Sequence, residues 1–174
     1  REAERAFAAM PAGAVAPVAV PPWRGEVLTR ALQGSSQSHL VLGFPVPPRR
    51  ADDPVATVAA ALLGEGMSSP LLDRVREQRG LAYYTACSAD VLDMCGQFVI
   101  EASMAPDDAV PLLREVTGLL REHALRADPA DLERARQQLA VRSLRAQERG
   151  LRWLEDLALD WMATGGMRPE AERL

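Results

Sequence analysis

The side chains that could hold a metal ion are few and widely spaced in this sequence. There are two histidines and two cysteines: His39 and His123 are far apart, while Cys87 and Cys95 fall in one short segment. Structural zinc sites use four Cys or His ligands, and catalytic sites use three protein ligands. Neither His-Glu-x-x-His nor His-x-x-Glu-His, the spacings that set two zinc-binding histidines beside a glutamate, occurs. We therefore predict no metal site within this chain.

Other roles are expected for these four residues. His39 is predicted to lie on a strand as a packed or hydrogen-bonded side chain. His123 is predicted near a helix C-terminus, where partial positive charge is favourable. Cys87 and Cys95 could face each other across a hairpin, but two cysteines make no disulfide framework. We interpret them as reduced, half-buried thiols, because cysteine packs as a small apolar residue.

Nucleophiles and phosphate-binding loops are also poorly supported. The serines Ser68, Ser69 and Ser88 lie in no Gly-x-Ser-x-Gly elbow, and neither histidine has a sequence reason to lie near them. A Cys87 nucleophile would lack a base for the same reason. The stretch Gly64–Met67 is glycine-rich but lacks the Lys-Ser/Thr of a phosphate-binding loop. The chain alone is therefore predicted to be a binding or structural domain without activity of its own.

Composition narrows the class further. The chain has 174 residues, a hydrophobic fraction of 48% and a net charge of −4, which suit one globular domain and argue against nucleic-acid binding. No apolar run approaches the roughly 20 residues that span a bilayer. No secretory signal is visible, but the chain is interpreted as a fragment, from which targeting information could have been removed. The location is therefore unknown; a cytoplasmic one is favoured and a periplasmic one stays open.

The chain divides near its first tryptophan. Residues 1–23 are interpreted as a helix remnant, Arg1–Met10, followed by a proline-rich linker, Pro11–Trp23, left from a preceding half. Residues 24–174 are interpreted as the domain itself. Because Pro169–Leu174 has the pattern of a helix start, we predict that this domain is truncated at its C-terminal end.

Alternating and helical periodicities within this domain predict an α+β fold. Two antiparallel strand pairs, each followed by helices, indicate a mainly antiparallel sheet with helices packed on one face. The expected strands are Glu26–Gln33, Gln37–Val46, Leu81–Val91 and Cys95–Met104. Four helices are expected. The first begins at Asp52-Asp53-Pro54 and ends at Gly64–Gly66, and the second runs from Ser69 to about Gln78 and is stopped by Gly80. The third covers Pro106–Ala124, and the fourth starts at an Asp128 cap and has a break near Gly150.

One long stretch resembles a known family. Gly64-Glu65-Gly66-Met67-Ser68-Ser69-Pro70-Leu71 followed by Arg76-Glu77-Gln78-Arg79-Gly80-Leu81-Ala82-Tyr83 is similar to the Gly-Gly-x-Met-Ser-Ser-Arg-Leu…Arg-Glu-x-x-Gly-Leu-Ala-Tyr pattern of the pitrilysin, insulin-degrading and mitochondrial processing peptidases. The flanking segments Gln37–Gly43, Met104–Asp107 and Asp131–Ala135 agree in type and order. The resemblance covers about Trp23 to Gly166. Pro70 departs from it, since the family usually has arginine there.

This resemblance implies the C-terminal, zinc-free half of a zinc metallopeptidase. In that family two homologous α+β halves, fused or separate, enclose a chamber in which peptides are cleaved. The other half holds the zinc, and this half contributes an arginine and a tyrosine seven positions apart. Arg76 and Tyr83 have that spacing here. The resemblance thus implies peptide as substrate, a zinc-bearing half as partner, and no cofactor bound by this chain.

The chemistry of the two residues fits the implied roles. A guanidinium offers a charged fork of donors that could hold a peptide carbonyl or a terminal carboxylate. A phenol could donate to a developing oxyanion. On the pattern of residues alone, Arg76 could equally be a solvated helix-end charge and Tyr83 a half-buried strand residue. The neighbours Arg74, Arg79 and Tyr84 are interpreted as structural.

Two other functions remain open on sequence grounds. The chain could be a non-catalytic structural or interaction subunit with the same fold, or a small-ligand binding module. The first would be favoured if neither the sequence upstream of Arg1 nor a neighbouring gene contained His-x-x-Glu-His. No sequence motif that would cradle a ligand supports the small-ligand binding module.

Overall fold

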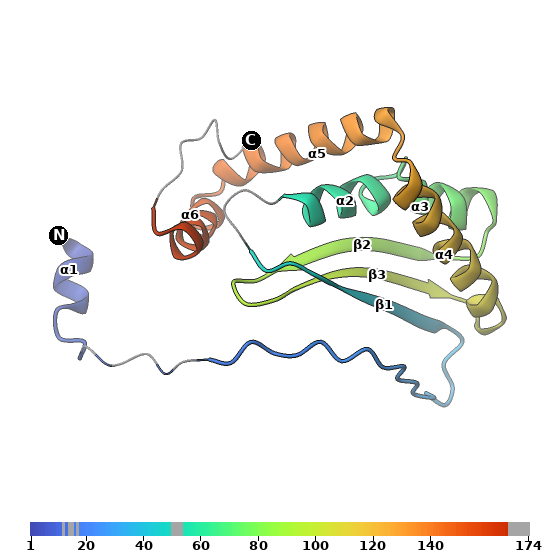
Figure 1. Ribbon diagram of the computed structural model, residues 1–174, viewed down its shortest axis with the longest axis horizontal. Coiled ribbons are helices and arrows are strands. Elements are labelled where there is room, and N and C mark those ends of the chain that lie inside the picture. The colour runs from blue at the N-terminus through green and yellow to red at the C-terminus, as the bar shows by residue number, and fades with distance from the viewer. Residues whose placement is uncertain (12, 14–15, 17, 50–53, 167–174) are drawn as a thin grey trace.

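The computed structural model describes all of the chain except residues 12, 14–15, 17, 50–53 and 167–174. Helices and strands alternate in blocks along it (Figure 1). In chain order the elements are α1 (Glu2–Phe7), β1 (Ser38–Val46), α2 (Val55–Gly64), α3 (Pro70–Leu72), the π-helix η1 (Asp73–Gln78), β2 (Tyr84–Val91), β3 (Gly96–Met104), the 3-10 turn η2 (Pro106–Asp108), α4 (Ala109–Leu125), α5 (Pro129–Gln147) and α6 (Gly150–Thr164).

The three strands form one antiparallel sheet in the order β1-β3-β2. Alternate residues of the central strand β3, among them Ile100, Ala102 and Met104, are buried against the helices. Leu112 and Val116 of α4 and Val75 of η1 complete that core. Helices α2 to α6 lie on one side of the sheet, whereas α1 stands apart from it, and the described residues of the N-terminal segment run past the opposite side (Figure 1). The predicted α+β class, with helices on one face of an antiparallel sheet, is confirmed.

Most of the predicted elements are confirmed, with small shifts at their ends. The hairpin is formed by β2 and β3, and Leu92 N–H donates to Cys95 O across its turn at 2.8 Å. The Asp128 carboxylate accepts from Ala130 N–H at 2.8 Å and caps α5, which ends before the predicted break at Gly150. Pro54 is the N-cap of α2 rather than its first residue. The predicted cap at Asp52-Asp53 lies outside the described residues.

One predicted strand is wrong. Residues 26–33 form no strand, and their apolar side chains are solvent-exposed, with Val27 at 91%. A strand requires a hydrogen-bonded partner, and none of the described strands pairs with this segment. Its alternation of apolar and polar residues is loose, and local sequence alone cannot replace the hydrogen bonds that a partner strand provides.

The first helix, α1, falls within the predicted Arg1–Met10 helix. The assignment of residues 1–23 to a preceding half, and of 24–174 to a truncated domain, stays a prediction.

Candidate functional site

The segment that carries Arg76 is anchored by buried residues on its inner side. Ser69 caps the turn, its Oγ accepting from Leu72 N–H at 3.4 Å, and Pro70 begins the helix, a position that suits proline. Leu71 and Val75 are fully buried in the core. The sequence predicted one helix here, but residues 73–78 are a π-helix. Such helices are rare and often occur at functional sites.

Arg76 lies on η1 with its side chain 45% exposed. Its Nε is 3.5 Å from Oε1 of the adjacent Glu77, a contact between two exposed groups. Its carbonyl accepts from Gly80 N–H at 2.9 Å, and Leu81 N–H donates to Val75 O at 2.8 Å. Gly80 has a positive φ of 62°, a conformation that glycine adopts without steric cost. These contacts hold the turn that leads from Arg76 to Tyr83.

Tyr83 lies one residue before β2, not within a strand as predicted. Its N–H donates to Ser103 O at 2.9 Å, so the backbone is tied to β3. The residue is 62% exposed, which leaves its ring on the surface rather than half-buried. The arrangement presents one permanent cation and one phenol, each on a fixed backbone and each accessible to a ligand.

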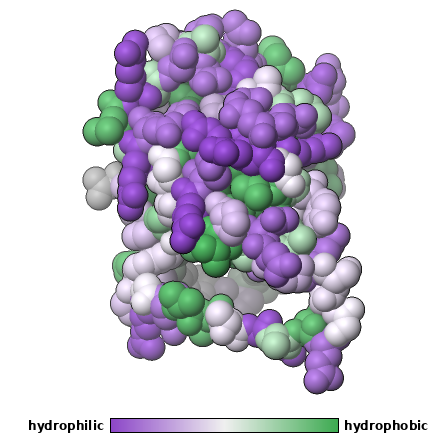
Figure 2. Space-filling view, turned by 90° about the vertical axis from the view of Figure 1, so that its right-hand side faces the viewer, coloured by the Kyte–Doolittle hydropathy of each residue, from purple (hydrophilic) through white to green (hydrophobic). Residues whose placement is uncertain are grey.

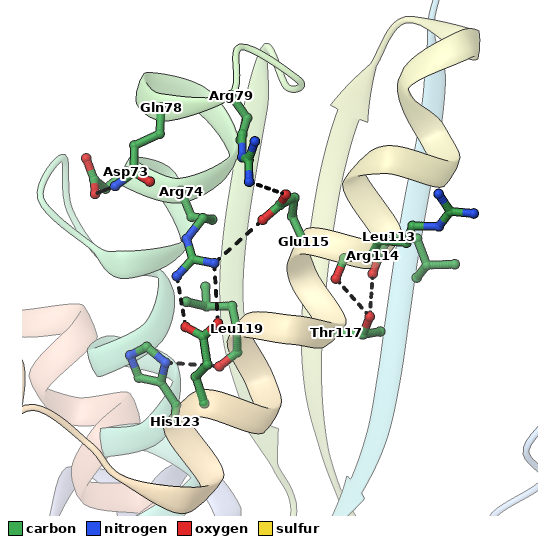
Figure 3. A network of polar contacts seen from close by, with 11 residues as sticks. Asp73, Arg74, Gln78, Arg79, Leu113, Arg114, Glu115, Thr117, Leu119 and His123 are labelled. Carbon is green, nitrogen blue, oxygen red and sulfur yellow. Dashed lines mark hydrogen bonds and ion pairs between the residues drawn. The ribbon is translucent and has the colours of Figure 1, made fainter.

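The neighbouring arginines are engaged with helix α4 (Figure 3). Arg74 contacts Glu122 at 2.8 Å and Glu115 at 3.6 Å, and Arg79 contacts Glu115 at 3.0 Å. The hydrogen bond with Glu122 is the largest cause that raises the pKa of Arg74. These contacts agree with the structural interpretation of both arginines.

The end of the molecule seen in Figure 2 is largely hydrophilic, with smaller hydrophobic areas between the polar side chains.

A contact that the sequence did not predict joins His39 to Ser103. His39 Nδ1 lies 2.9 Å from Ser103 Oγ, and both residues stand in register with Tyr84 across the three strands. The predicted hydrogen-bonded histidine on a strand is thereby confirmed for His39. The two residues are 64 positions apart, so only strand register brings them together. His123 lies in the last turn of α4, near the predicted helix end, and its Nδ1 is 3.0 Å from the carbonyl oxygen of Leu119.

The thiols are free and partly buried, as predicted. Cys87 faces the core from β2, and burial raises the pKa of its thiol to about 12. Within the described residues, no three His, Cys, Asp or Glu side chains lie close enough together to hold a metal ion. None of the helices in that part of the chain combines the length and hydropathy that a bilayer crossing requires.

Comparison with known proteins identifies the family. A family model described as the Peptidase M16 inactive domain matches residues 2–139. The chain belongs to this family. The resemblance to zinc metallopeptidases noted from the sequence is thereby confirmed, together with the assignment to the half that lacks the zinc motif.

Relatives of this M16 inactive domain are named as zinc proteases. One from Rickettsia felis, "Uncharacterized zinc protease", is 30% identical over 138 residues, covering 78% of this chain and 34% of the relative. One from Streptomyces coelicolor with a similar name is 37% identical over 102 residues, covering 54% of this chain and 21% of the relative. The chain thus spans about a third or less of the length of these relatives.

Solved structures support the same fold. A peptidase M16 inactive domain from Pseudomonas fluorescens is 28% identical and superimposes with a TM-score of 0.54, covering 61% of this chain and 26% of that chain. A protease from Helicobacter pylori is 22% identical with a TM-score of 0.67, covering 76% of this chain and 33% of that chain. The Helicobacter similarity concerns the fold alone.

Proposed function

We propose that this M16 inactive domain is the substrate-contacting half of a zinc-dependent peptidase that cleaves peptides between two homologous halves. The relatives' names support a zinc protease, and the described residues of this chain offer no cluster of metal ligands. Zinc therefore belongs to the partner half, in the same polypeptide or in a separate subunit. The observation that carries the proposal is the exposed pair Arg76 and Tyr83, on either side of the turn at Gly80.

Each residue has a role that its chemistry suits. The Arg76 guanidinium donates to a carbonyl or terminal carboxylate of the peptide, and its weak contact with Glu77 leaves its donors available. The Tyr83 hydroxyl donates to the oxygen on which charge develops as the peptide bond is attacked. A donor placed there contributes to rate because its bond strengthens in the transition state.

The test is peptide cleavage by the protein that contains this chain together with its zinc-bearing half. Arg76→Ala and Tyr83→Phe are each expected to lower kcat/KM by about tenfold or more. Arg76→Ala removes a charged hydrogen-bond donor to the peptide, and Tyr83→Phe removes a transition-state donor, a loss that typically costs about 10²–10³-fold. Tyr84→Phe is the matched control, because this neighbouring exposed phenol has no assigned role. Unchanged rates in both Arg76→Ala and Tyr83→Phe would reject these roles and favour a structural or interaction subunit.

A further inference from the structure

Glu115 of α4 is bound at the same time by arginines from both ends of the π-helix. Its Oε1 lies 3.0 Å from Arg79 Nη2, and its Oε2 lies 3.6 Å from Arg74 Nη1. Figure 3 shows both guanidinium groups directed from η1 toward α4. The Glu115 side chain is only 21% exposed, so this carboxylate has lost much of its water and depends on the two arginines for compensation.

The π-helix accounts for this double contact. In an α-helix, residues five positions apart are separated by about 140° around the axis and face different directions. In a π-helix the hydrogen bonds run from i to i+5, so residues five apart lie about one turn apart on one face. Arg74 and Arg79 are five apart and meet a single carboxylate. The ion pairs and the π-turn therefore stabilise each other.

Arg76 lies between these two arginines but takes no part in the network. It is two positions from Arg74, which turns it roughly half-way around the helix axis. Its contact is with Glu77, on the exposed side. A change in the winding of η1 would therefore redirect the Arg76 side chain even though no atom of Glu115 contacts it.

We propose that Glu115 is a positioning residue: by holding Arg74 and Arg79 it maintains the π-turn that aims Arg76 at the bound peptide. This inference rests on the proposed function of Arg76. Without the carboxylate, Arg79 loses its 3.0 Å ion pair and Arg74 keeps only Glu122, so nothing joins the two arginines and the turn relaxes toward ordinary α-helical winding.

The test is a double-mutant cycle on kcat/KM, again in the protein with its zinc-bearing half. Glu115→Gln keeps the shape of the side chain and removes its charge. We expect it to lower kcat/KM by about three- to tenfold when Arg76 is present, and to cause no further loss in the Arg76→Ala background, because coupled residues are non-additive. A residue that only stabilised the fold would reduce both backgrounds equally.

The outcomes separate the two proposals. If Arg76→Ala lowers kcat/KM but Glu115→Gln leaves it unchanged, or if the two losses multiply, the positioning role is rejected while the proposed function stands. If Arg76→Ala itself has no effect, the positioning role is rejected, and the proposed function is rejected as well only when Tyr83→Phe is also without effect. Should Glu115→Gln fail to fold, Arg79→Ala replaces it in the cycle, because it removes the 3.0 Å contact and leaves Arg74 paired with Glu122.

A matched control comes from an ion pair outside the Glu115 network, between the C-terminal cap of α2 and α5. Glu65 lies 3.1 Å from Arg142 and is also partly buried, with a side chain 32% exposed. Glu65→Gln removes a similar charge from a similar environment without touching the ion pairs of Arg74 and Arg79. It is expected to leave kcat/KM unchanged in the presence and absence of Arg76.

Discussion

At the residue scale, Cys87 illustrates how close packing suppresses reactivity. Its partly buried thiol packs against the core, and burial raises its pKa to about 12, so it stays protonated at neutral pH. Since the thiolate is the nucleophile, we predict that a disulfide reagent at pH 8 modifies Cys95 well before Cys87. Mass spectrometry of the labelled peptides measures this. Equal labelling of both cysteines in the folded protein would contradict it.

The same shift has a consequence for stability. The pKa of Cys87 is raised in the folded state, so its neutral form is favoured there and the unfolded chain loses the proton first. This contribution to the free energy of unfolding is fully present below the ordinary thiol pKa and is lost as pH rises toward 12. We predict that Cys87→Ser reduces the fall in stability over this alkaline range, as measured by urea unfolding at a series of pH values.

The residues of the candidate site differ in how far sequence could predict them. Arg76 and Tyr83 were found only because a long motif resembled a family, since their spacing alone is compatible with ordinary surface residues. The contact between His39 and Ser103 could not be predicted, because it depends on the register of β1 and β3. The contacts of Arg74 and Arg79 with Glu115 could likewise not be predicted from the sequence, because α4 lies far from both arginines along the chain.

At the element scale, the end of α2 lies against β2 so closely that only glycine fits. A Cβ at Gly64 would overlap the side chain of Cys87 and lie 2.8 Å from its backbone nitrogen. We predict that Gly64→Ala lowers the free energy of unfolding by about 1–3 kcal/mol, the usual range for overpacking. Denaturant unfolding of the two proteins tests this.

Gly118 provides the matched control for that substitution. It lies within α4, and a Cβ there would meet no atom within 4 Å. Gly118→Ala is therefore expected to stabilise the protein by about 0.5–1 kcal/mol, because alanine has the higher helix propensity. If both glycine variants changed stability in the same direction, the close approach of α2 to β2 would be contradicted.

Helices and strands could be predicted from the sequence where the periodicity of their apolar residues was strong. The stripe of Leu112 and Val116 predicted α4, and the alternation in β3 predicted a half-buried strand. Residues 26–33 have a weaker alternation and no partner strand, so the prediction there was wrong. The π-helix was not predictable, because its winding is supported by contacts with α4 rather than by its own residues.

At the scale of the whole molecule, the proposed function assigns different tasks to two halves. In this proposal this domain supplies side chains that contact the peptide, and the partner half supplies zinc. We predict that a chelator abolishes peptide cleavage yet leaves amide-exchange protection unchanged in the central strand β3, because the described residues of this domain form no metal site. Loss of protection at Ile100 on chelation would contradict that division.

The most direct test of the central claim is to map which residues the bound peptide contacts. A peptide carrying a photoactivatable group, bound to the protein with its zinc-bearing half in the presence of a chelator, can be cross-linked and the attachment mapped by mass spectrometry. We predict that this domain is labelled within the segment from η1 to the start of β2, which contains Arg76 and Tyr83, and that Arg76→Ala reduces this labelling. Cross-links confined to the zinc-bearing half would contradict a substrate-contacting role for this domain.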